Sequence, residues 1–162
     1  GEQIMSKNNT VILRGNLADD PYTQQMSDGV AYLRFFLVVE REGGLSHNHG
    51  GDPQRADLLR VIEFGPRAEL DYYYLRSGAE VVVFGRLHSR AYKDLRSGVE
   101  IRRNQLEVVT QFIVYGRGCD MEQGDRHRDE MAERGGEDAA VAVSESVILP
   151  KHLLKMLSAD AE

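Results

Sequence analysis

The chain has 162 residues, 41% of them hydrophobic, which is enough for one domain with a core and an additional segment. Its apolar runs are far shorter than the roughly 18 residues of a membrane-spanning helix, so no membrane span is expected. Cys119 is the only cysteine, which excludes an intrachain disulfide and a cysteine-rich zinc site.

The net charge of −6 is unevenly distributed along the chain. Residues 1–118 contain 15 Lys and Arg against 15 Asp and Glu, whereas residues 119–162 contain 5 basic and 11 acidic residues. A body of zero net charge can still present a basic face, because phosphate contacts depend on the local potential. The acidic total therefore does not exclude a nucleic-acid ligand.

The first half of the chain predicts two strands and a long loop. After an N-terminal extension over residues 1–8, β-branched and aliphatic residues predict a strand over Thr10–Leu17, and Gly15 indicates a bulge or bend within it. A longer strand follows over Val30–Arg41. The glycine-rich, polar composition of residues 42–55 then predicts a long loop.

The second half predicts one helix between strands. A third strand, Leu58–Phe64, ends at Gly65-Pro66, and a proline suits the first turn of a helix. The apolar spacing predicts a helix over Arg67–Ser77. Two further β-prone segments, Glu80–Arg90 and Val99–Tyr115, predict the fourth and fifth strands.

Three strands, a helix and two strands is the element order of an all-β OB-fold, a five-stranded Greek-key barrel with one short helix between strands 3 and 4. We assign this domain to residues 9–118. Residues 119–145 are acidic and glycine-rich and predict a flexible linker. Residues 146–162 predict a short amphipathic docking helix with one apolar face, formed by Leu153, Leu154 and Leu157. The surface expected to receive this face is a partner protein or, as the alternative, the protein's own barrel.

Several short motifs fall on the predicted barrel in a fixed order, namely Val11-Ile12-Leu13, Gly15-Asn16-Leu17, Asp20-Pro21, Phe35-Phe36-Leu37 with Arg41, Arg60-Val61, Phe64-Gly65, Tyr74-Leu75-Arg76 with Gly78, and Gly85 with Leu87 and Arg90. With these motifs, the segment from Asn9 to Tyr115 resembles the bacterial and mitochondrial single-stranded DNA-binding protein family.

The resemblance implies a set of ligand-facing residues. The family's stacking aromatics fall on Leu58, Phe64 and Tyr92, where related proteins usually have tryptophan, phenylalanine and tryptophan. Without the resemblance, Phe64 and Tyr92 would more readily be interpreted as barrel residues. The chain has no tryptophan, so we expect weaker binding per nucleotide than in a typical member. The nucleic-acid-binding residues predicted in this way are Phe36, Arg41, Arg60, Phe64, Arg86, His88, Arg90, Tyr92 and Arg102, with Arg103 as the alternative to Arg102. For Phe36, a contact between subunits is the equal alternative to base stacking.

Three consecutive tyrosines, Tyr72, Tyr73 and Tyr74, point in different directions on the predicted helix, which favours packing over ligand binding. His47 and His49 lie in the glycine-rich loop without a third ligand nearby, so no metal site is expected. No nucleophile, base or carboxylate cluster is placed for catalysis, so we expect neither an enzyme nor a cofactor.

The resemblance implies sequence-independent binding and protection of single-stranded DNA in replication, recombination and repair, by a homotetramer or homodimer. RNA is the alternative ligand, because base stacking and phosphate contacts serve both nucleic acids. The alternative function is that of an OB-fold interaction subunit in an organellar RNA-processing complex. The expected location is the bacterial cytoplasm or nucleoid, with a mitochondrial or other organellar matrix as the alternative.

Overall fold

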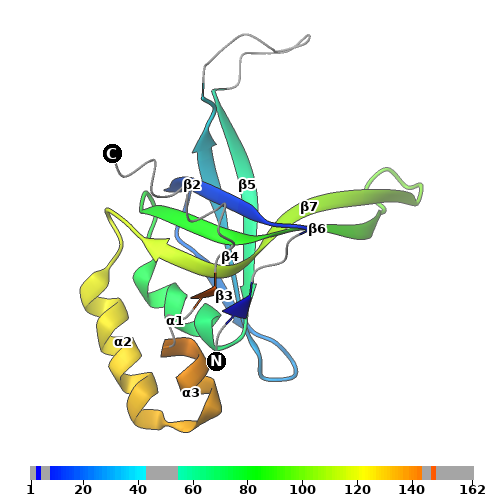
Figure 1. Cartoon of the computed structure of the whole chain (residues 1–162). Helices are drawn as coiled ribbons and strands as arrows, with labels where there is room; N and C mark the ends of the chain where they lie inside the picture. The colour runs from blue at the N-terminus through cyan, green and yellow to red at the C-terminus, as the bar shows by residue number, and fades with distance from the viewer. Residues whose placement is uncertain (1–2, 5–7, 43–54, 144–146, 149–162) are drawn as a thin grey trace.

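The structure is a computed structural model that describes residues 3–4, 8–42, 55–143 and 147–148. It contains a β-barrel with helices packed at one end (Figure 1). The elements in chain order are β1 (Gln3–Ile4), β2 (Val11–Leu17), β3 (Tyr22–Gln25), β4 (Ala31–Glu40), β5 (Ala56–Phe64), α1 (Pro66–Tyr74), β6 (Glu80–Asp94), β7 (Ile101–Tyr115), α2 (Met121–Arg134), α3 (Gly136–Val143) and β8 (Val147–Ile148).

The barrel is closed by pairings at both ends of its sheet. β2 pairs with β6 and also with β4, β6 pairs with β7, and β4 pairs with β5. A short parallel pairing between β5 and β7 completes the ring. The predicted all-β OB-fold is therefore confirmed, with its helix between the third and fourth barrel strands. The short β3, which the sequence did not predict, adds a further strand at the edge of β4.

Two glycines lie where strands approach too closely for a side chain. Gly15 lies beside the point where β2 changes partner, and a Cβ atom there would lie 2.2 Å from the carbonyl oxygen of Val38. At Gly85 a Cβ atom would lie 2.3 Å from the carbonyl oxygen of Val109, and the β6–β7 register shifts at this point. The glycines therefore allow the bend and the bulge that close a small barrel.

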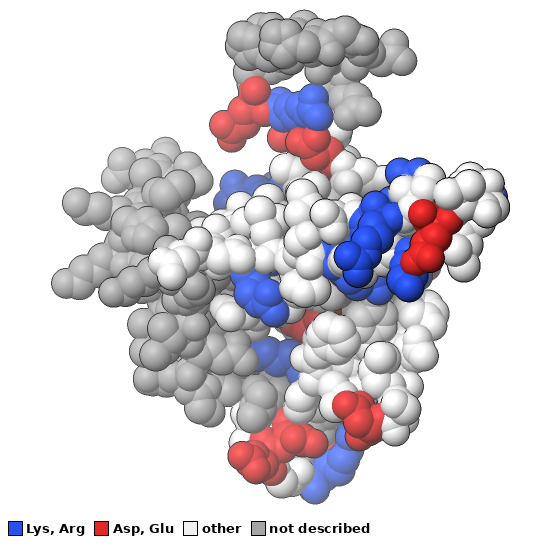
Figure 2. All heavy atoms as spheres, turned by 90° about the vertical axis from the view of Figure 1, so that its right-hand side faces the viewer, with Lys and Arg blue, Asp and Glu red and all other residues white. Residues whose placement is uncertain are grey.

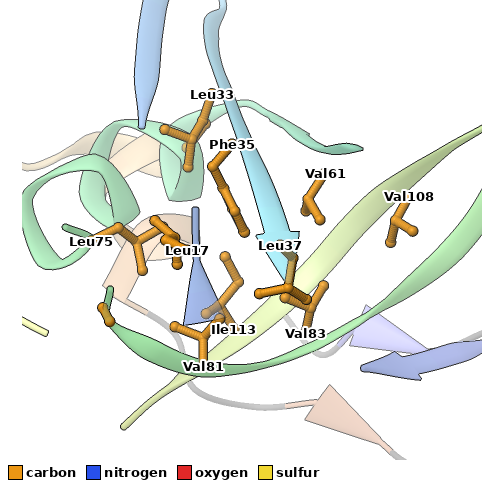
Figure 3. Close-up of a cluster of buried hydrophobic side chains, with 12 residues drawn as sticks. Leu17, Leu33, Phe35, Leu37, Val61, Leu75, Val81, Val83, Val108 and Ile113 are labelled. Carbon is orange, nitrogen blue, oxygen red and sulfur yellow. The ribbon is translucent and has the colours of Figure 1, made fainter. Parts of the chain in front are cut away.

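The barrel core follows the alternation of the strands. Leu33, Phe35 and Leu37 of β4 point inward and are at most 2% exposed. They meet Val61 from β5 and Val83 from β6 (Figure 3). Burying such aliphatic and aromatic side chains is the main stabilising contribution of a barrel of this kind.

Helix α1 closes one end of the barrel. It begins at Pro66, one residue before the predicted start, and ends at Tyr74, three residues before the predicted end, because Leu75 has an extended backbone. Ala68 and Leu75 join the barrel core. Gly78 then adopts a φ of 81°, a left-handed conformation that glycine accepts without strain.

Residues 121–143 differ from the predicted flexible linker. They form the helices α2 and α3, which pack on α1 (Figure 1). The contact depends on Gly124, because a Cβ atom there would lie 2.0 Å from the ring of Tyr74. The Tyr74 ring also stacks on Tyr115, with centroids 4.1 Å apart, and the Tyr73 ring stacks on His127 at 3.7 Å. This segment has few large aliphatic side chains, so aromatic contacts form much of its packing against the barrel domain.

The acidic residues of this segment also have specific partners. Asp125 accepts a hydrogen bond of 2.7 Å from the hydroxyl of Tyr74. Asp120 caps α2 by accepting from the backbone N–H of Gln123, and it forms an ion pair with Arg76. Side chains of α2 therefore reach back to the barrel domain. We call the three packed helices α1, α2 and α3 the helical layer.

Of the predicted docking segment, residues 146–162, the structure describes only Val147 and Ile148, which form β8 and pair in parallel with β1. Leu153, Leu154 and Leu157 lie outside the described residues. Of the helices that the structure describes, none is long and apolar enough to cross a membrane.

Candidate nucleic-acid interface

The outward side chains of β4 and β5 form one surface. Because Leu33, Phe35 and Leu37 point into the core, the alternate residues of β4 point away from it. The register places Phe36 opposite Arg60, and residues directly opposite each other lie on the same side of a sheet. The predicted residues Phe36 and Arg60 therefore share a face.

This surface continues across the junction between β5 and β7. Ile62 pairs with Val109, and the Nε atom of Arg60 lies 2.9 Å from Oε2 of Glu107. From β7 the surface extends onto β6, where the register gives the pairs Arg86 with Val109, His88 with Glu107, Arg90 with Gln105, and Tyr92 with Arg103.

We call this surface the four-strand face. Its members on β4 and β5 are Tyr32, Arg34, Phe36, Val38, Leu58, Arg60, Ile62 and Phe64. Its members on β6 and β7 are Arg86, His88, Arg90, Tyr92, Arg103, Gln105, Glu107 and Val109. Seven of the nine predicted nucleic-acid-binding residues lie on it, although they come from three separate strands of the chain.

Aromatic rings are exposed on the β4–β5 part of the face. Phe64 is 49% exposed and leans on Tyr32, with ring centroids 5.1 Å apart and planes inclined by 47°. Leu58, one of the three positions at which the sequence predicted base stacking, is 63% exposed. The sequence prediction omitted Tyr32. Its signal was present, since Tyr32 and Phe36 are separated by an even number of residues in one strand and therefore share a side.

The face extends to the edge strand β3. Tyr22 pairs with Arg34, and the guanidinium carbon of Arg34 lies 4.7 Å from the centre of the Tyr22 ring. This distance is within the range of a cation–π contact. Tyr22 is 45% exposed and so offers one further aromatic ring, which the sequence prediction also omitted.

An acidic side chain lies among the cations of the face. Glu107 is only 2% exposed, and its carboxylate is 2.9 Å from Nε of Arg60, 3.5 Å from Nε of Arg90 and 3.8 Å from Nδ1 of His88. The Nε atom of Arg60 has no hydrogen-bond partner among the described side chains, so its contact with Glu107 is an ion pair without an aligned hydrogen bond. A buried carboxylate requires this kind of compensation by nearby cations.

The β6–β7 hairpin carries the face beyond the barrel. The hairpin projects away from the barrel on the side opposite the helical layer (Figure 1). Viewed from that side, Lys and Arg side chains gather with an acidic group among them (Figure 2). Near its tip, Arg103 donates a hydrogen bond of 2.8 Å to Asp94, and Arg96 contacts the same carboxylate. These donors hold the pKa of Asp94 below its usual value, with the backbone N–H of Arg96 as the largest cause.

Two predicted cations lie on the other side of their strands. Arg41 follows the inward alternation of Leu37 and forms an ion pair of 2.6 Å with Asp57, whose pKa this hydrogen bond lowers. Arg102 pairs with Lys93 and alternates with Arg103, so it points away from the four-strand face. Of the two neighbouring arginines, the structure therefore brings Arg103 and not Arg102 to Tyr92.

A second group of ionisable side chains lies where the barrel meets α1. Glu63 is buried, and burial together with the charge of Asp71 raises its pKa, although the charge of Arg67 opposes this change. Burial also raises the pKa of Asp71, and Tyr115 donates a hydrogen bond to its carboxylate. These groups face the helical layer and are separate from the four-strand face. No cluster of metal-ligating side chains occurs within the described ranges.

Known proteins match this chain over the segment that forms the barrel. A profile of the single-strand binding protein family matches residues 8–115. "Single-stranded DNA-binding protein 1" of Chlorobaculum tepidum is 29% identical over 90 residues, which cover 56% of this chain and 54% of that protein. "Single-stranded DNA-binding protein" of Xanthomonas campestris pv. campestris is 33% identical over 110 residues, which cover 68% of this chain and 62% of that protein. The matches thus span between half and two thirds of each relative. From the four-strand face and the profile match together, the chain belongs to the single-strand binding protein family.

Proposed function

We propose that the protein binds single-stranded DNA without sequence preference through the four-strand face. The observation that carries this proposal is the continuity of the face: arginines from all four strands and half-buried or exposed aromatic rings from β4, β5 and β6 occupy one surface. Single-strand binders of low sequence preference combine a positively charged path for the backbone with aromatic side chains on which bases stack. Each base presents a flat ring, so stacking is tolerant of sequence.

We propose different tasks for the residues of the face. Phe64 and Tyr92, at the two ends of the face, are the proposed stacking platforms, and Tyr32 supports Phe64 from the neighbouring strand. Arg86 and Arg90 are the proposed phosphate contacts between them. Neutralising phosphates releases counterions, so binding of this kind weakens as the salt concentration rises.

The cellular role we propose is the protection of single strands in replication, recombination and repair, without catalytic activity. Family membership supports this role, and the bacterial origin of the two relatives supports a bacterial cytoplasmic or nucleoid location. Homotetramers or homodimers are part of the proposal. Leu87 and Leu106 support self-association, because both are exposed on the side of the β6–β7 hairpin opposite the four-strand face. For Leu153, Leu154 and Leu157, protein docking is a proposal supported by the sequence alone.

The first test is fluorescence anisotropy of labelled dT and U oligonucleotides of about 35 nucleotides, titrated with the full chain in a salt series. We expect tighter binding of dT than of U and a loss of affinity with salt. Tyr92→Ala should weaken binding by about 1 to 3 kcal/mol, because it removes one stacking platform.

The matched control is Val114→Ala, which truncates an exposed apolar side chain near the end of β7 that is farthest from the hairpin. This variant should bind as the wild type does. Tighter binding of U would redirect the proposal to RNA. If the folded wild type bound neither oligonucleotide at low salt, the proposed function would be wrong.

A further inference from the structure

Glu107 is an unexpected residue for a surface that receives phosphates. It belongs to the four-strand face, and its carboxylate is almost completely buried beneath Arg60, Arg90 and His88. A negative charge at this position repels a phosphate backbone, and burying a carboxylate is unfavourable unless cations compensate it. Its presence therefore requires a physical reason.

The geometry of Arg60 and Arg90 supplies a physical reason for the buried carboxylate. Both ion pairs are formed at Nε, at 2.9 Å for Arg60 and 3.5 Å for Arg90. An ion pair at Nε leaves the two terminal nitrogens of a guanidinium for other partners. Within the described residues, a hydrogen bond to the side-chain oxygen of Gln105 is the one such contact of Arg90. The carboxylate thus contacts each guanidinium at Nε, next to the aliphatic part of the side chain, while the terminal nitrogens can contact a ligand.

The two arginines differ in sequence position but converge on this one carboxylate. Arg60 comes from β5, opposite Phe36, and its side chain is 18% exposed. Arg90 comes from β6, two residues before the proposed platform Tyr92, and its side chain is 50% exposed. Because β7 lies between β5 and β6, a residue of β7 is placed to contact side chains from both strands.

We propose that Glu107 is a positioning residue of the binding face: it holds the guanidinium groups of Arg60 and Arg90 in place between the aromatic platforms before the nucleic acid arrives. This inference rests on the proposed function. A long side chain that is already ordered loses less conformational freedom on binding, so a held arginine binds more tightly than a mobile one.

The proposal predicts that removing the charge of Glu107 changes the binding affinity in the direction opposite to that expected from electrostatics alone. Removing a carboxylate makes the face more positive, which by itself would strengthen binding and steepen its salt dependence. If positioning dominates, Glu107→Gln instead weakens binding of dT oligonucleotides by about tenfold, because two arginines lose their anchor. Anisotropy titrations of the full chain at two salt concentrations measure both quantities.

A double-mutant cycle separates positioning from a general effect on the fold. Arg60→Ala should weaken binding in the wild type and have a clearly smaller effect in the Glu107→Gln background, because the anchor is already absent. Phe64→Ala should have the same effect in both backgrounds. Equal effects of Arg60→Ala in both backgrounds would overturn the proposal.

Charge-conserving variants keep the inference testable if Glu107→Gln does not fold. Arg60→Lys and Arg90→Lys retain the charge but lose the Nε atom that meets Glu107, so each should weaken binding severalfold. The matched control is Arg102→Lys, on the same hairpin but on its other side, which should bind as the wild type does. Thermal unfolding of every variant verifies that the fold is retained.

The outcomes distinguish the two proposals. Absence of binding by the folded wild type refutes the proposed function together with this inference. Binding by the wild type, with equal or tighter binding by Glu107→Gln or with unchanged binding by Arg60→Lys, refutes the inference alone.

Discussion

The four-strand face and the helical layer contain the same kinds of side chain but use them differently. In the helical layer, Tyr74 is completely buried, stacks on Tyr115 and donates a hydrogen bond to Asp125. On the four-strand face, Phe64 touches Tyr32 and leaves 49% of its surface exposed. An aromatic ring with all its neighbours supplied by the protein stabilises the fold, whereas a ring with one open side is available to a base.

The charged residues show the same contrast. Glu69 of α1 contacts both His127 and Arg134 of α2, so its charge fastens one helix to another. Glu107 contacts Arg60, Arg90 and His88, which all lie on the four-strand face. Acidic residues therefore mark the packing of the helices in one region and the organisation of arginines in the other. Residue type alone does not separate the two uses.

The largest expected effect tests the aromatic half of this comparison. Tyr74→Ala should lower the free energy of unfolding by about 3 to 5 kcal/mol, as expected for truncating a buried aromatic residue, while the folded variant binds dT oligonucleotides as the wild type does. Phe64→Ala should have the reverse profile, with a loss of stability of about 1 kcal/mol or less and a loss of binding affinity of about 1 to 3 kcal/mol.

Chemical denaturation gives the stability of both variants, and anisotropy gives their affinities. A Phe64→Ala variant that lost several kcal/mol of stability without losing affinity would place Phe64 among the packing residues and remove it from the binding face.

The next effect tests how the helical layer is held to α1. Gly124→Ala places a Cβ atom against the Tyr74 ring, where 2.0 Å is available, so α2 must move outward. We expect a destabilisation of about 1 to 3 kcal/mol, as for overpacking elsewhere, even though alanine favours helix formation. Denaturant unfolding measures this effect.

Arg126→Ala is the control, because this residue of α2 is exposed and pairs with Glu122 one turn before it. That variant should change stability by about 0.5 kcal/mol or less. If Gly124→Ala were as stable as the wild type, the close contact between α2 and Tyr74 would be wrong.

The smallest effect depends on pH and concerns Glu63, at the boundary of the two regions. Burial raises the pKa of Glu63 in the folded protein, so the protonated form is favoured there. Its contribution to stability is fully present below the unfolded pKa of about 4.3 and is lost as the pH rises through the folded pKa. Glu63→Gln should therefore be more stable than the wild type at pH 8, by on the order of 1 kcal/mol, and the difference should close toward pH 4.

Unfolding curves at several pH values measure this trend. Glu100→Gln, an exposed residue that pairs with Lys93 on the β6–β7 hairpin, is the control and should show little difference between pH 4 and pH 8. An advantage of Glu63→Gln that grew as the pH fell would contradict the raised pKa.

Much of the barrel could be predicted from the sequence because its signals are local. β-branched segments, the Gly65-Pro66 break and the glycines within strands each act over a few residues. The helical layer could not be predicted in this way. Its main contact joins Tyr74 to Gly124 and Asp125, about fifty positions later in the chain, and the low aliphatic content between residues 119 and 145 indicated disorder.

The sequence by itself determined the order of the barrel elements, because strand and turn signals are local, and its family motifs predicted most of the residues now found together on the four-strand face. Only the tertiary structure decided the side on which each cation lies. The bulge at Phe84 and Gly85 shifts the β6–β7 register, and the register then directs Arg103 rather than Arg102 toward Tyr92. The tertiary structure also decided that Arg60 and Arg90 share Glu107, because the strand order brings together residues that are distant in the chain.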